Sequence, residues 1–114
     1  MGLSSAELLQ GTLQILILKA LFTESTHGYG IARWIEETTD DVLRIEEGSL
    51  YPALRRLEDK GFVESEWGVS ANNRRARYYS LSAAGRAHLR REATAWTRYA
   101  GAVTRVLRAE PSLG

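Results

Sequence analysis

The last quarter of the chain carries the pattern that most restricts how this protein can fold. From position 89 onward, six apolar or small residues are spaced 4, 3, 4, 3 and 4 apart, which is the a/d repeat of a coiled-coil helix: Leu89, Ala93, Trp96, Ala100, Val103 and Leu107. Ser82 is a good N-cap residue, so we expect one helix from about Ser82 to Arg108. Such a helix is about 40 Å long, more than the core of a small domain can cover. We therefore expect this seam to pack against a second copy of the chain.

The positive charge is concentrated in the second part of the chain. Residues 1–69 contain six Lys/Arg and twelve Asp/Glu, a net charge of −6, whereas residues 70–114 contain nine Arg and two Glu, a net charge of +7. This asymmetry favours contact with a polyanion, although the arginines of a helix face can also simply be solvated. The chain has no cysteine, which excludes a disulfide framework and a cysteine metal site.

Two helices are expected in the first forty residues. The first begins at the capping box of residues 4–7 and runs to about Phe22; it is apolar on nearly every side, which indicates burial against both its own domain and a second subunit. The second follows the loop that ends in residues 27–30 (HGYG). His27 is a catalytic or metal-binding candidate in principle, but the chain offers only one other histidine, His88, and no cysteine to complete such a site.

A third helix is predicted from the residues around a proline. It begins near Gly48 or Ser49, because Pro52 is tolerated where the backbone amide has no helical partner, in the first turn. Gly61 ends it. Three leucines at helical spacing define its buried face: Leu50, Leu54 and Leu57.

Two segments with strand character follow and complete the predicted fold. Residues 62–67 alternate in polarity, residues 76–81 are rich in aromatics, and the polar stretch 68–75 between them is typical of a turn. Three helices followed by a hairpin with arginines at its tip predict a winged helix-turn-helix, mainly α with a small β hairpin. We expect a DNA-binding domain over residues 1–81, and a dimerisation helix with a short tail over residues 82–114.

Three motifs in this order resemble the PadR-type transcriptional regulators. They are residues 48–61 (GSLYPALRRLEDKG), residues 77–85 (RYYSLSAAG) and residues 27–30 (HGYG). The chain is similar to the compact subgroup with a single C-terminal dimerisation helix, and the resemblance covers essentially its whole length. It implies a homodimer that binds a pseudo-palindromic operator in double-stranded DNA and represses transcription. The predicted hairpin of residues 62–81 corresponds to the wing of this fold. Its tip departs from the family, because it reads Asn-Arg-Arg-Ala at 73–76 where Gly-Arg-Pro is common.

The resemblance also assigns residues to the DNA interface. It implies that the third helix enters the major groove, and that the entry of the second helix and the wing contact the flanking backbone: Tyr29, Ser49, Tyr51, Pro52, Arg55, Arg56, Arg74, Arg75 and Arg77. Arginine suits both tasks, because its planar donor fork fits phosphate and guanine. The alternatives are that the two tyrosines only pack, that the helix arginines pair with Asp59, and that the wing arginines are merely solvated. We expect Tyr78 and Tyr79 to pack the hairpin rather than stack on bases.

Trp96 suggests a ligand site at the centre of the dimer. It is large beside Ala93 and Ala100, and a two-fold axis would bring its two copies close together around a slot for a planar, apolar effector. The resemblance supports this site, since compact PadR-type regulators of multidrug transporters bind aromatic drugs in such a pore. The matching positions are Leu8, Gly11, Ile15 and Trp96. The alternative is that Trp96 fills the seam by itself.

Other classes of protein fit the sequence less well. A protein–protein interaction module with the same fold would keep the seam but give the arginines no role. An enzyme needs a converging acid, base or nucleophile, and neither such a set nor a phosphate-binding glycine loop is visible. The chain starts without a basic signal segment, and its longest apolar stretch is too short to span a bilayer. We expect a cytoplasmic protein with no metal, no cofactor and no membrane partner; its basic last helix is better explained by dimerisation than by membrane binding.

Overall fold

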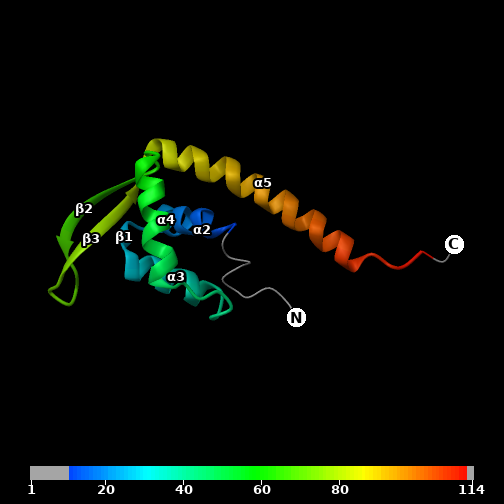
Figure 1. Ribbon diagram of the computed structural model, residues 1–114, viewed down its shortest axis with the longest axis horizontal. Coiled ribbons are helices and arrows are strands. Elements are labelled where there is room, and N and C mark those ends of the chain that lie inside the picture. Colours follow the sequence, from blue (N-terminus) through cyan, green and yellow to red (C-terminus); the bar gives the residue numbers. More distant parts are fainter. Residues whose placement is uncertain (1–10, 113–114) are drawn as a thin grey trace.

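A computed structural model describes residues 11–112 (Figure 1). It confirms a mainly helical winged helix-turn-helix with a long C-terminal helix. The elements in chain order are α2 (Leu13–Thr23), β1 (Thr26–His27), α3 (Gly28–Thr38), α4 (Glu47–Asp59), β2 (Val63–Val69), β3 (Arg75–Leu81) and α5 (Ala83–Arg108). The end of the first predicted helix is confirmed within one residue, but the prediction of one continuous helix from the capping box is wrong, because residues 11 and 12 form a turn and α2 begins at Leu13 with Thr12 as its N-cap. The capping box at residues 4–7 and Leu8 lie outside the described residues.

Helix α2 lies at the centre of the core. It packs against α3, α4, β3 and the first part of α5, and five of its eleven residues are buried. The predicted leucine stripe of α4 is confirmed, because Leu50, Leu54 and Leu57 are each at most 2 % exposed. Burying an aliphatic side chain of this size contributes about 1.5–3 kcal/mol, so each leucine of the stripe stabilises the core substantially.

The loop between α3 and α4 is held by side chains from the end of α3. The carboxylate of Glu36, which is 9 % exposed, accepts a hydrogen bond from the amide of Ile45 at 3.0 Å and lies 3.8 Å from the guanidinium of Arg44. The hydroxyl of Thr39 accepts from the amide of Leu43 at 3.1 Å. These contacts hold the loop that leads into α4.

Helix α4 begins at Glu47, slightly earlier than predicted. Pro52 is therefore the sixth residue of α4 and lies in its second turn, so the prediction that Pro52 lies in the first turn is wrong. The physical reason is that Glu46 adopts an extended backbone, and its carbonyl accepts from the amides of Ser49 and Leu50 at 3.0 and 2.9 Å, which starts the helix early. Proline carries no amide hydrogen, so it cannot donate to the carbonyl four residues before it.

The sheet has three strands in the order β1-β3-β2, all antiparallel. Strands β2 and β3 form the predicted hairpin, with a tip at residues 70–74 in which Asn73 has a positive φ of 58°. Strand β1 was not predicted: its two residues, Thr26 and His27, pair with Tyr79 and Tyr78. Two residues are too few to show the alternation by which strands are predicted.

The junction between the hairpin and α5 is tightly bonded. As predicted, Ser82 is the N-cap of α5, and its hydroxyl accepts from the amide of Gly85 at 3.0 Å. The same hydroxyl donates to the carbonyl of Gly61 at 2.6 Å, and the amide of Ser82 donates to the carbonyl of Phe62 at 3.1 Å. The helix that starts here runs out beyond the other elements (Figure 1), and the molecule, this helix included, is 65 Å in its longest dimension. No helix within residues 11–112 has the length and apolar character needed to cross a membrane.

Candidate nucleic-acid interface

The outward face of α4 carries the residues predicted to enter the DNA groove. Ser49, Pro52, Arg55 and Arg56 are exposed, opposite the buried leucine stripe. Neither arginine forms an ion pair within residues 11–112, so the predicted alternative of pairing with Asp59 is not what the structure shows.

Tyr51 lies at the contact between α4 and α3. It is 45 % exposed, and its phenol packs so closely over Gly28 that a Cβ atom there would lie 2.6 Å from the tyrosine oxygen. Helix α3 begins at this contact, with His27 as its N-cap: Nδ1 of His27 accepts from the amide of Gly30 at 3.0 Å. Tyr29, in the first turn of α3, is 70 % exposed and so is not a core residue. Its hydroxyl is accessible to a ligand beside the recognition helix.

The wing has an aromatic residue at its centre that the sequence reasoning missed. Trp67 on β2 is 56 % exposed, and the guanidinium groups of Arg75 and Arg77 lie 4.5 and 5.6 Å from the centre of its ring. Trp67 pairs directly with Arg77 across the hairpin, so the two side chains share one face of the sheet. The alternation along each strand could have placed Trp67 and the arginines on one face. That inference also needs the register in which the two strands pair, and the sequence did not give it.

Arg77 is also bonded to the recognition helix. Its Nε donates to the hydroxyl of Ser65 at 2.8 Å, and its Nη2 lies 3.4 Å from a carboxylate oxygen of Glu58 on α4. The hydroxyl of Ser65 donates to that same oxygen at 2.6 Å. Beneath this network, burial raises the pKa of the Tyr79 hydroxyl above its ordinary value of 10.0, and the charge of Arg77 opposes the rise. Tyr79 is 6 % exposed and packs the hairpin, as predicted.

Two adjoining concavities bring most of the predicted DNA-binding residues together. One of about 950 Å³ lies between the entry of α3, the start of α4 and the wing, and its lining includes Tyr29, Tyr51, Arg74, Arg75 and Arg77. The other, of about 540 Å³, runs along α4 and its lining includes Pro52, Arg55 and Arg56. They share three lining residues: Tyr51, Arg77 and Tyr79. Of the nine predicted residues only Ser49 lies outside both; it is exposed in the first turn of α4.

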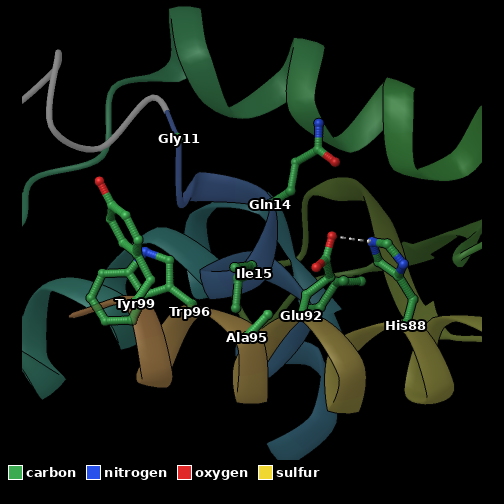
Figure 2. A pocket seen from close by; sticks show the side chains of 9 residues that line it. Gly11, Gln14, Ile15, His88, Glu92, Ala95, Trp96 and Tyr99 are labelled. Carbon is green, nitrogen blue, oxygen red and sulfur yellow. Dashed lines mark ion pairs between the residues drawn. The ribbon is translucent and has the colours of Figure 1, made fainter. Parts of the chain in front are cut away.

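A separate groove of about 390 Å³ lies between α2 and the middle of α5 (Figure 2). It brings together three of the four predicted effector positions, Gly11, Ile15 and Trp96. The prediction did not include the polar lining, in which Nε2 of His88 lies 3.8 Å from a carboxylate oxygen of Glu92. Those two residues are four apart on α5 and so share a face, a signal the sequence did carry. Within residues 11–112, no three His, Asp or Glu side chains converge on a position that could hold a metal ion.

The first part of the predicted seam of α5 packs on its own chain, and the later part is exposed. Leu89 is buried and Ala93 packs against the core of its own chain, whereas Trp96, Val103 and Leu107 are 45 %, 38 % and 79 % exposed. The expectation that Leu89 faces a second copy therefore differs from the structure, because α2 already covers it. Ala100 is half-buried. The far part of the seam has no cover within the described residues of one chain.

A family model and solved structures of similar proteins identify the family of this chain. The transcriptional regulator PadR-like family matches residues 17–91. A PadR family transcriptional regulator from Eggerthella lenta superposes with a TM-score of 0.75 at 31 % identity, covering 91 % of this chain and 88 % of that one. A transcriptional regulator from Clostridium thermocellum gives a TM-score of 0.78 at 26 % identity, with 87 % and 96 % covered. A protein encoded in a Streptomyces fradiae transposon is 41 % identical over 92 residues, which are 79 % of this chain but only 24 % of that protein.

Proposed function

Because this chain belongs to the transcriptional regulator PadR-like family, we propose that it is a homodimer that represses transcription by binding a pseudo-palindromic operator in double-stranded DNA. The observation that carries the proposal is the pair of arginine- and tyrosine-lined concavities between α3, α4 and the wing. Repression would follow from steric exclusion of the polymerase at the bound operator.

The exposed face of α4 is proposed to read the major groove. A helix is about 10–12 Å across and the major groove of B-DNA is about 12 Å wide, so α4 fits with its leucine stripe turned away. Arg55 and Arg56 are exposed and free of ion pairs within the described chain, which leaves their donor forks available for guanine or phosphate. Ser49, Tyr51 and Pro52 would meet the groove at the start of the helix.

The wing and the entry of α3 are proposed to hold the flanking phosphates. Arg74 and Arg75 are exposed at the end of the hairpin, where clustered like charges favour an anionic partner. Tyr29 lines the same concavity as the wing arginines, and its accessible hydroxyl would contact a phosphate there. Arg77 belongs to the same surface, because it lines both concavities.

The exposed part of α5 supports a dimer. The far half of this helix exposes five large apolar residues, which a soluble monomer rarely leaves together: Trp96, Tyr99, Val103, Val106 and Leu107. The heptad spacing of the seam favours another helix as the cover, and a second copy of α5 carries the matching pattern. In such a dimer, two α4 helices would reach successive major grooves about 34 Å apart.

A planar aromatic effector is proposed to bind where the α2–α5 groove meets the dimer axis. The groove is open in the single chain, and Trp96 and Tyr99 border it with their rings exposed (Figure 2). A second copy would enclose a compound lying on these rings. Emission of Trp96 in a Trp34→Phe, Trp67→Phe background should be quenched by a micromolar planar dye. No quenching while the dimer stays intact would mean that Trp96 fills the seam by itself.

Footprinting on the DNA directly upstream of the protein's own gene tests the main proposal. We expect a symmetric protected region, and duplex affinity that falls steeply with salt. Arg55→Ala or Arg56→Ala should cost roughly 1–3 kcal/mol of discrimination between operator and random duplex if the lost contact is bidentate to guanine. Arg98→Ala, an exposed arginine on α5, is the matched control and should leave discrimination unchanged. No duplex binding at low salt would instead favour a protein–protein interaction module.

A further inference from the structure

Arg77 differs from the other predicted DNA-binding arginines because the protein already surrounds it with partners. Its guanidinium bonds to Ser65, lies 3.4 Å from Glu58 and sits over the ring of Trp67. Resting on the proposed DNA-binding function, we infer that Arg77 is a positioning residue that braces the wing against the recognition helix, and not a DNA contact. We call Glu58, Ser65, Trp67 and Arg77 the brace.

The brace joins the recognition helix to both strands of the wing. Glu58 comes from the last turn of α4, Ser65 and Trp67 from β2, and Arg77 from β3. One carboxylate oxygen of Glu58 serves both Ser65 and Arg77, so the helix holds both strands of the hairpin at a single point. The strands are linked again by the direct pairing of Trp67 with Arg77.

The surroundings of Arg75 show the contrast. Arg75 also lies over Trp67, but it forms no ion pair within residues 11–112 and stands closer to the tip of the wing. A phosphate can bind Arg75 without displacing any carboxylate. To bind Arg77 as fully, a phosphate would have to compete with Glu58, whose negative charge would also repel it.

The brace gives the DNA-binding surface its shape before DNA is present. A hairpin held to α4 presents the recognition helix and the wing as one unit, so binding does not have to order one against the other. Loss of the brace should therefore weaken binding through wing mobility and leave the number of phosphate contacts unchanged. The salt dependence of the affinity measures that number, because each phosphate contact adds about 0.9 to the slope of log K against log salt.

Affinity for a duplex operator, measured by fluorescence anisotropy at several salt concentrations, tests the inference. Arg77→Ala and Arg77→Lys should each weaken binding about two- to fivefold, the range expected from a half-exposed ion pair, with an unchanged slope. Arg75→Ala should lower the slope by about 0.9. The lysine variant is decisive because it keeps the charge but loses the planar fork that the brace uses.

A variant that leaves every charge in place further distinguishes a bracing role of Arg77 from a direct contact with phosphate. Ser65→Ala removes the hydroxyl that links Glu58 to Arg77, and should weaken binding with the slope unchanged. Ser80→Ala, on the opposite face of β3, is its matched control and should bind like the wild type. If Arg77 contacts a phosphate directly, Ser65→Ala will bind at least as tightly as the wild type, since it frees Arg77.

The outcomes distinguish failure of the brace from failure of the proposed function. If the wild type does not bind duplex DNA at low salt, the proposed function is wrong. If the wild type binds and Arg77→Ala lowers the slope as Arg75→Ala does, or if Arg77→Lys binds like the wild type, the brace is wrong and DNA binding stands. Circular dichroism of each variant identifies one that has not folded, and the remaining variants then decide.

Discussion

The first turn of α5 packs so closely on the hairpin that one added methyl group should destabilise the protein. Gly85 is buried, and a Cβ atom there would overlap the carbonyl oxygen of Phe62 and lie 2.9 Å from its carbonyl carbon. The obstacle is backbone, which cannot rotate away as a side chain can. That carbonyl oxygen also accepts from the amide of Ser82, so moving it would strain a second contact of the junction.

The expected cost of Gly85→Ala follows from this overlap. Forcing an extra methyl group into packed structure costs about 1–3 kcal/mol, and the higher helix propensity of alanine offsets at most about 1 kcal/mol of that. For a chain of this length, each kcal/mol moves the midpoint of thermal unfolding by roughly 4 °C, so we expect a midpoint several degrees lower. Circular dichroism at 222 nm, at one fixed protein concentration, measures it.

Gly101→Ala is the matched control on the same helix. A Cβ atom at Gly101 meets nothing within 4 Å among the described residues, so alanine should stabilise the protein through helix propensity alone, by up to about 1 kcal/mol, and so raise the midpoint. The two substitutions are chemically identical and should shift the midpoint of thermal unfolding in opposite directions. An unchanged or higher midpoint for Gly85→Ala would refute the argument from the Phe62 carbonyl.

Three further predictions concern the loop, the hairpin and the far end of α5. Glu36→Ala should lower the free energy of unfolding in urea by about 1–3 kcal/mol, because it leaves the buried amide of Ile45 without its acceptor. Glu36→Gln, which keeps an acceptor oxygen, should lower it less. Tyr79 has a folded-state pKa raised above 10.0 by burial, so the stability it contributes is present below pH 10 and is lost as the pH rises through the folded value; Tyr79→Phe should flatten this alkaline decline, and an unchanged decline would refute it. Leu107→Lys should leave a folded monomer in sedimentation experiments, with α5 less helical than in the wild type; an unchanged dimer would place the interface elsewhere.

The sequence predicted the elements whose signals are local. The leucine stripe of α4 repeats within two turns of one helix, and the Ser82 cap depends on residues three positions apart, so both could be located without any knowledge of the fold. The predicted start of α4 was one or two residues late, which wrongly placed Pro52 in the first turn, because that start depends on the backbone of Glu46 and on the loop before it, where Glu36 bonds to Ile45. Helix boundaries of this kind are decided by tertiary contacts.

The surroundings of the predicted site residues were harder to anticipate. The nine candidate DNA-binding residues came from separate motifs, and the structure assembles eight of them around two concavities. What the motifs lacked was register: the pairing of Trp67 with Arg77 depends on a five-residue wing tip, and a shift by one residue would turn Trp67 to the other face. The contact of Arg77 with Glu58 joins positions 19 apart, which no local pattern reports.

The anchored start of α5 has a geometric consequence for a dimer. Its 26 residues span about 39 Å, and the bonds of Ser82 fix one end of this rod to the DNA-binding unit (Figure 1). In a dimer held together at the far end, a change of about 5° in the crossing angle would change the separation of the two DNA-binding units by about 3.4 Å, which is the rise of one base pair. Because α5 is long, a small rotation at the dimer axis would shift the two DNA-binding units relative to each other by about one base pair.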